Sequence, residues 1–263
     1  MYILFLFLLW LAFWGVAWFL YRRGRLDEDY SGDVLALGAL ALATVGFFWR
    51  LLFTPTWMPA DGGDLLSFLF PLYRFAAQSL REGEIPLWNP YLYSGAPFAA
   101  DIQSGIFYPL NLLAFALVPA ITFRTMELLS VFHFFLAGSF MYLCLRFWER
   151  EERLSRLSCL AGAIAFAFSD LFITHFGNLN MIAAASWLPI VLLLYHRALV
   201  ERRVGYALSA GVALGVAILA GHIQPVFHIL FLLGLYLLYR VYVDYREERG
   251  GITRLLGLSI LTL

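Results

Sequence analysis

Apolar residues fill most of the chain in long runs, and one long polar stretch interrupts them. The interruption spans residues 54–106, where Asp, Gly, Pro, Asn and Gln gather. The apolar runs approach the roughly 20 residues that a helix needs to cross a bilayer. The pattern therefore predicts an all-α, polytopic transmembrane helical bundle that forms a single transmembrane domain over residues 1–263. The expected spans are 1–21, 34–53, 122–147, 158–174, 181–199, 204–220 and 223–243, with another beginning at residue 252.

Two short juxtamembrane helices are expected within a long loop over residues 54–120. In residues 65–82, polar and helix-terminating residues recur at helical spacing, so they share one face while Leu, Phe and Tyr fill the other. Such an amphipathic helix lies in the plane of the membrane interface. The apolar run 106–119 is too short to cross the bilayer and is expected to lie on the same leaflet or dip into it. The polar face of the first helix consists of Ser67, Pro71, Arg74, Gln78 and Arg81.

The distribution of arginine predicts the topology. Hydrophobic residues make up 62% of the chain and charged residues 14%, against about 25% charged residues in an ordinary globular domain, so the composition indicates a membrane protein. Of the 18 basic residues, all of them arginine, 14 lie in or beside the connections near residues 22–25, 146–156, 196–203 and 240–254. Under the positive-inside rule these connections face the cytoplasm. The N-terminus and the long loop are then outside. The net charge is zero, so no basic surface for nucleic acid is indicated.

Two carboxylates follow the second expected span directly. Asp61 and Asp64 are separated by Gly62 and Gly63, which allow a tight turn and the close approach of a ligand to the backbone. A helix-capping role explains one aspartate. A pair at a membrane surface also suits a general base or a divalent cation, because one oxygen takes a proton from a hydroxyl while another holds the cation against a phosphate. We expect Asp61 and Asp64 to be catalytic, and to bind Mg²⁺ or Mn²⁺ if the reaction depends on a metal.

The same topology brings further polar side chains to the outer side from three separate segments. A solvated helix end explains any one of them. Polar groups that converge beside an amphipathic helix indicate a pocket at the boundary of water and lipid. We expect a substrate-binding surface that includes Arg74, Asp101, Gln103, His175, Asn178, His222 and Gln224, with Asp170 and Asn180 nearby.

Arg74, Arg81 and Arg124 are among the arginines that remain on the outer side, against the charge rule. One reading is that their guanidinium groups reach toward lipid headgroups. The other is that one of them grips a phosphate, for which a planar guanidinium offers two matched donors. Arg124 also lies three residues before Glu127 on one expected helix, a spacing that allows an ion pair.

Residues 83–113 carry a pattern that resembles the YfhO family of bacterial integral membrane proteins. The matching pieces are a G-x-x-P-x-W stretch, a G-x-P turn and a Y-P-L-N entry to the next helix. Residues 175–193 and 221–228 also look like this family, and the resemblance covers residues 35–245. The motif residues are Gly83, Pro86, Trp88, Gly95, Pro97, Tyr108, Pro109 and Asn111.

This resemblance implies a glycosyltransferase of the GT-C type in the bacterial plasma membrane. Such an enzyme moves a sugar from a polyprenyl phosphate to a cell-envelope glycan or polymer on the extracytoplasmic face. The acidic motif of the family falls on Asp61 and Asp64. Because family members usually continue beyond this length, the chain is expected to be the N-terminal part of a longer GT-C module.

Two other classes stay open. A transporter or lipid flippase would place ionisable residues at the bilayer midplane on interrupted helices, with an internal repeat. A non-catalytic membrane scaffold subunit would use Asp61 and Asp64 only to cap a helix.

Overall fold

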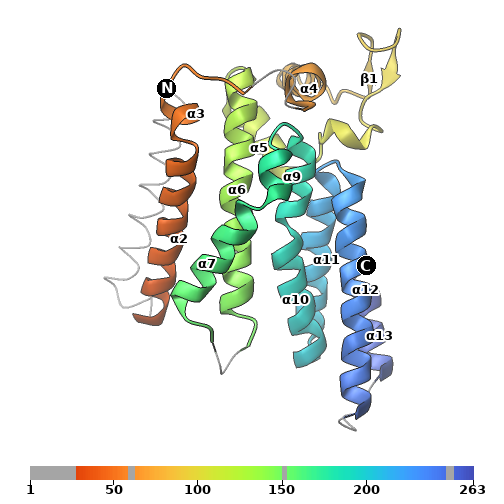
Figure 1. Cartoon of the computed structure of the whole chain (residues 1–263). Coiled ribbons are helices and arrows are strands. Elements are labelled where there is room, and N and C mark those ends of the chain that lie inside the picture. The colour runs from red at the N-terminus through yellow and green to blue at the C-terminus, as the bar shows by residue number, and fades with distance from the viewer. Residues whose placement is uncertain (1–27, 59–62, 150–152, 247–251) are drawn as a thin grey trace.

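The computed structural model describes residues 28–58, 63–149, 153–246 and 252–263. Within these ranges the chain is a bundle of helices that stand side by side (Figure 1). The first expected span at 1–21 and Asp61 lie outside the described residues.

Most of the expected spans are present as helices. Four segments are long and apolar enough to cross a membrane, namely Phe123–Arg146, Arg156–Thr174, Leu179–Glu201 and Ile223–Arg246. The prediction of an all-α membrane bundle is thereby confirmed at the level of helices and their apolar character. The bundle consists of α2 (Glu28–Phe47), α3 (Trp49–Phe53), α6 (Phe123–Arg146), α7 (Arg156–Ala167), α8 (Asp170–Thr174), α9 (Leu179–Ser186), α10 (Leu188–Glu201), α11 (Val204–Leu219), α12 (Ile223–Arg246) and α13 (Ile252–Thr262).

The arginine-rich helix ends gather at one end of the bundle, the lower end in Figure 1. The buried carboxylate of Asp33 at the start of α2 accepts hydrogen bonds from Arg146 of α6 at 3.0 Å and Arg156 of α7 at 3.1 Å. Arg202, which follows α10, pairs at 3.0 Å with Asp244 near the end of α12. These contacts join α2 to α6 and α7, and the end of α10 to α12, at the end of the bundle where the arginine-rich connections lie.

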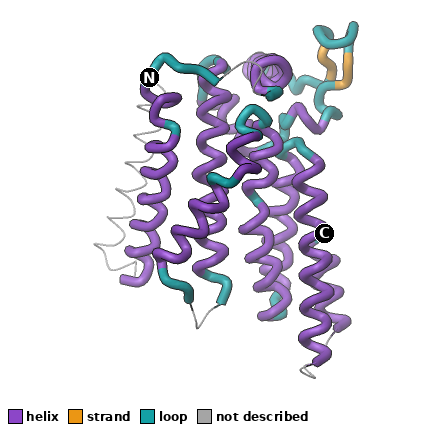
Figure 2. Tube along the Cα trace, in the orientation of Figure 1, coloured by secondary structure: helices purple, strands orange, loops and turns teal. Residues whose placement is uncertain are grey.

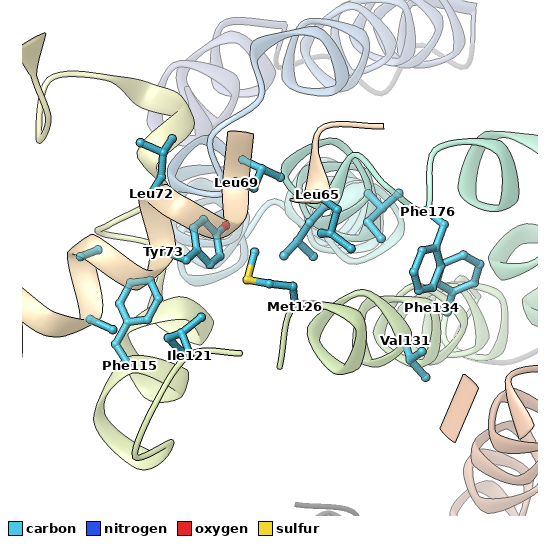
Figure 3. Close-up of a cluster of buried hydrophobic side chains, with 14 of the residues drawn as sticks. Leu65, Leu69, Leu72, Tyr73, Phe115, Ile121, Met126, Val131, Phe134 and Phe176 are labelled. Atoms are coloured by element: carbon cyan, nitrogen blue, oxygen red, sulfur yellow. The ribbon is translucent and has the colours of Figure 1, made fainter. Parts of the chain in front are cut away.

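At the opposite end, α4 (Phe70–Arg81) lies across the bundle, and Figure 2 shows it end-on while the long helices run along the page. A π-helical turn (Leu65–Leu69) precedes it. Its predicted polar face is confirmed, because Ser67, Pro71, Arg74, Gln78 and Arg81 are all exposed. Its apolar face does not rest on lipid. Leu72 and Tyr73 are buried on the protein core, and Figure 3 shows Tyr73 beside Phe115 and Met126.

The rest of the long loop folds over the same end. α5 (Pro109–Leu117) has nine residues, a length of about 14 Å at roughly 1.5 Å per residue, so it is too short to cross a bilayer. A small hairpin of β1 (Trp88–Asn89) and β2 (Ala96–Pro97), which was not predicted, precedes it. Arg124 at the start of α6 donates hydrogen bonds to the carbonyls of Leu52 and Thr54. The chain therefore leaves the bundle and re-enters it at one end.

Candidate functional site

Asp64 stands just before the π-helical turn, but its side chain does not cap it. Its backbone carbonyl accepts hydrogen bonds from the N–H groups of Phe68 and Leu69, whereas the carboxylate makes no capping hydrogen bond. The side-chain capping role expected from the sequence is therefore wrong for Asp64. Its Oδ2 instead accepts a hydrogen bond of 2.9 Å from the Nδ2 of Asn178, so the carboxylate is directed toward a distant segment of the chain.

Gly63 makes this approach possible. Its φ of 122° is one that side chains rarely adopt, and a Cβ there would lie 2.9 Å from the backbone carbon of Gly177. A side chain at this position would push apart the two loops that carry Asp64 and Asn178. The sequence suggested that a ligand approaches the backbone closely at Gly63. The structure places the backbone of Gly177 there instead.

Asp64 lines a polar pocket together with residues from three other segments. The pocket has a volume of about 110 Å³. This is more than the roughly 10–15 Å³ needed for one water, and less than the roughly 300–1,000 Å³ of a pocket that encloses a drug-sized ligand. It is therefore large enough to receive one functional group of a ligand and too small to enclose a whole drug-sized molecule. Its lining residues are Asp64, Leu69, Gln103, Asn178, Asn180, Met181 and His222.

A buried network of side chains fixes the walls of this pocket. The hydroxyl of Tyr73 donates to Asn180 Oδ1 at 2.7 Å and accepts from Asn111 Nδ2 at 2.8 Å. Asn180 Nδ2 donates to the carbonyl of Gln103 at 2.7 Å, and Asn111 Nδ2 donates to that of Gly105 at 3.0 Å. Burial raises the pKa of Tyr73 well above its ordinary value, so its hydroxyl stays a donor. The network binds residues 102–105 of the loop to α4, α5 and α9.

His222 enters the pocket from the turn between α11 and α12. Its Nδ1 is buried and has no hydrogen-bond partner among the described residues. Burial lowers the pKa of His222, an effect that Asp64 opposes and His175 reinforces. The neutral form of the imidazole is thereby favoured, and its buried Nδ1 is a polar atom without a partner in the described part of the chain.

Four of the expected site residues come together in the pocket: Asp64, Gln103, Asn178 and His222. His175 does not line it, and its Nδ1 lies 2.9 Å from the carbonyl of Leu171. This neighbouring imidazole contributes to lowering the pKa of His222.

The other expected residues lie elsewhere. Asp101 accepts a hydrogen bond of 2.9 Å from the backbone N–H of Gln103 and so caps a 3₁₀ turn (Ile102–Ser104). Gln224 is exposed in the first turn of α12, and Arg74 is exposed on the outer face of α4. None of these three side chains lines the polar pocket, because each is already committed to a cap or projects from an outward face.

The three outer arginines differ in their surroundings. Arg124 pairs with the buried Glu127 at 3.2 Å, as its spacing allows, and Arg81 donates to the carbonyls of Phe115 and Val118 at the end of α5. Both therefore hold the long loop to the bundle. Within the described ranges Arg74 makes no hydrogen bond or ion pair, so its guanidinium is available to an anion.

The oxygen donors of the polar pocket suit a hard cation. Asp64 supplies one carboxylate, beside the amides of Gln103 and Asn178. Mg²⁺ and Mn²⁺ prefer such ligands, and Mg²⁺ keeps several of its waters. No group of three or more His, Cys, Asp or Glu side chains suited to a metal occurs among the described residues, which exclude Asp61.

Tyr73 was missed by the sequence reasoning, while Asn111 was named only as a motif residue and Asn180 only as a neighbour of the expected site. Asn111 did carry a signal, since it is a lone amide within the apolar run 106–119. Buried amides must find hydrogen-bond partners, so such residues indicate a network even where the partners are unknown.

The fold and the site define a helical bundle with a polar pocket at one end, and four helices among the described residues are long and apolar enough to cross a membrane. No protein-family model, curated protein or solved structure matches the chain.

Proposed function

We propose that the chain belongs to a membrane glycosyltransferase that moves a sugar from a polyprenyl phosphate to a hydroxyl of a cell-envelope acceptor. The reaction would take place on the extracytoplasmic face of the bacterial plasma membrane. The observation that carries the proposal is the carboxylate of Asp64, which serves no helix cap and lines a pocket with the unpartnered nitrogen of His222. The pocket is lined by residues just before α4, at the start of α9 and just before α12, and Figure 1 shows these element ends opposite the arginine-rich ends of the bundle. The resemblance to the YfhO family supports the reaction class.

The geometry at Asp64 suits a general base. Asn178 binds Oδ2, and Oδ1 has no hydrogen-bond partner in the described part of the chain, so it is free to accept the proton of an acceptor hydroxyl. The hydroxyl oxygen then forms a bond to the anomeric carbon of the donor. The bond from that carbon to the phosphate oxygen breaks, and the phosphate leaves with the electron pair. Holding both reactants in line would supply much of the acceleration.

Other residues of the site would hold the reactants. His222 Nδ1 offers an acceptor for a sugar hydroxyl, and Gln103 and Asn178 offer amides. The free guanidinium of Arg74 suits the departing phosphate. A divalent cation held by Asp64 and the amides would neutralise charge on that phosphate.

The test is sugar transfer by full-length protein in liposomes, measured with a panel of radiolabelled polyprenyl-phosphate sugars and cell-envelope acceptors. Asp64→Asn is expected to lower the rate by about 10²- to 10⁴-fold, the usual contribution of a general base. Asp61→Asn tests the second aspartate in the same assay.

A matched control is Asp170→Asn, because this exposed carboxylate in the first turn of α8 does not line the pocket. It is expected to leave the rate unchanged. If Asp61→Asn and Asp64→Asn both retain full transfer, neither carboxylate is the base and the proposal is wrong.

A further inference from the structure

A second cavity lies next to the polar pocket. It is formed between residues 99–107 of the long loop and the last turn of α11, and its volume is about 230 Å³. We call it the apolar groove, because most of its lining residues are apolar, among them Ile102, Phe107, Ile218 and Leu219. Asp101 and Ser104 are the polar side chains that also line it. The polar pocket and the apolar groove have no lining residue in common.

One short segment separates the two cavities. Gln103 lines the polar pocket, whereas its neighbours Ile102 and Ser104 line the apolar groove. The segment is held through its backbone, since the carbonyl of Gln103 accepts from Asn180. The carbonyl of Ile102 packs on Gly221, where a Cβ would lie only 2.5 Å away. The wall is therefore a single, fixed turn of chain, with a polar cavity on one side and an apolar cavity on the other.

The apolar groove is continuous with the outer surface of α11. Its lining side chains Ile218 and Leu219 are 38% and 41% exposed, and Leu208 and Val212 on the same helix are 52% and 70% exposed. In a bundle that crosses a membrane, such uncovered aliphatic side chains face lipid. The groove thus leads from the hydrocarbon-facing surface to the wall of the polar pocket.

Two adjacent cavities of opposite character fit a ligand that has a polar head and a hydrocarbon tail. We propose that the apolar groove binds the isoprenoid chain of the lipid-linked sugar, at the units nearest the phosphate, while the polar pocket receives the sugar end. This inference rests on the proposed function for the identity of the ligand. An isoprenoid chain whose phosphate end lies at Gln103 reaches the lipid-facing surface by passing over Ile102. The side chains of Gln103 and Ile102 are both exposed on the segment that separates the two cavities.

Photocrosslinking tests the location without requiring transfer. The full-length protein in phosphatidylglycerol–phosphatidylethanolamine liposomes is irradiated with a polyprenyl phosphate that carries a diazirine on its first isoprene units. Label is expected within residues 99–107 and at Ile218 or Leu219, and unlabelled polyprenyl phosphate is expected to compete. Label elsewhere only, or equal competition by added phospholipid, would overturn the proposal, the latter because a bulk acyl chain then fills the groove.

Kinetics with donors of different chain length provide a second test. Leu219→Asn is expected to raise the KM for a long-chain donor about tenfold, the loss expected when a chain no longer packs on one leucine. A water-soluble donor with a ten-carbon chain should lose far less. Leu208→Asn is the matched control, because this exposed leucine near the other end of α11 lies outside the groove. Equal KM changes in both variants would contradict the proposal.

Ala100→Trp provides a variant that adds bulk in the groove and keeps all the native apolar groups of α11. It is expected to raise the KM for long-chain donors selectively, as Leu219→Asn does. Unchanged KM values would contradict binding of the isoprenoid chain in the groove. Asp64→Asn, by contrast, should lose transfer with both donors. A wild-type protein that labels in the groove but transfers no sugar would remove the proposed function and leave the chain-binding site standing.

Discussion

Gly221→Ala is expected to unfold the site end of the bundle at lower denaturant than the native protein. Gly221 has a φ of 93°, and a Cβ there would lie 2.5 Å from the carbonyl oxygen of Ile102 and 3.1 Å from Asn180 Nδ2. Because the nearest obstacle is backbone, rotation of a side chain cannot relieve the contact. The wall segment has to move away from the turn that carries His222.

The magnitude follows from three contributions. A non-glycine residue in this conformation costs of order 1–3 kcal/mol. Forcing an extra methyl into a packed site costs roughly another 1–3 kcal/mol, and the reduced entropy of the unfolded chain returns about 0.4–1 kcal/mol. The net loss is roughly 2–5 kcal/mol in the free energy of unfolding. Any shift of the wall also moves Gln103 relative to His222, so sugar transfer should fall as well.

Unfolding in detergent micelles under increasing dodecyl sulfate, followed by circular dichroism, measures the loss. Gly215→Ala is the matched control, because a Cβ at this position in α11 meets no atom within 4 Å. An alanine within a helix is about 0.5–1 kcal/mol more favourable than glycine, so the control should be as stable as the native protein or slightly more. Equal midpoints for Gly221→Ala and Gly215→Ala would refute the close contact at the wall.

Two further predictions concern charge. Arg124→Ala is expected to lower the free energy of unfolding by roughly 3 kcal/mol or more, because it leaves the buried Glu127 without its cation. Arg74→Ala should change the free energy of unfolding by no more than about 0.5 kcal/mol and weaken binding of the donor. Comparable unfolding midpoints for the two variants would contradict this. His222 has a lowered pKa, so below its ordinary 6.5 the unfolded chain takes up a proton that the folded protein does not. Native stability should therefore fall, relative to His222→Gln, as the pH drops from about 7 to about 5; parallel profiles would show that His222 is not buried as described.

The helices and the surface helix were predictable because each is encoded by a local pattern. In residues 65–82, spacings of three and four placed Ser67, Arg74 and Gln78 on one face, and all three are exposed. The local pattern could not reveal whether the apolar face of this helix packs on lipid or on protein. The same amphipathic pattern fits a helix on lipid and a helix on protein, and only the packing of Tyr73 on the core decides between them.

The lining of the polar pocket was predictable in part, since Asp64, Gln103, Asn178 and His222 line it while Arg74, Asp101, His175 and Gln224 do not. Counting arginines brought Asp64, Asn178 and His222 to one end of the bundle, and these three do line one pocket. Asp101 looked equivalent in the sequence but caps a turn instead. The difference arises because capping depends on the local backbone conformation, which a residue type alone does not determine.

Asn180 links the surface helix α4 to the segment that separates the two cavities. Its Oδ1 accepts from Tyr73 of the surface helix, and its Nδ2 donates to the carbonyl of Gln103 in the wall. A single buried amide on α9 therefore sets the distance between the surface helix and the wall. Because Gln103 faces the polar pocket while Ile102 faces the apolar groove, the same amide also positions both cavities relative to Asp64. In a chain so rich in interchangeable apolar residues, the polar side chains with fixed hydrogen-bond partners are the ones that specify where a reacting group would lie.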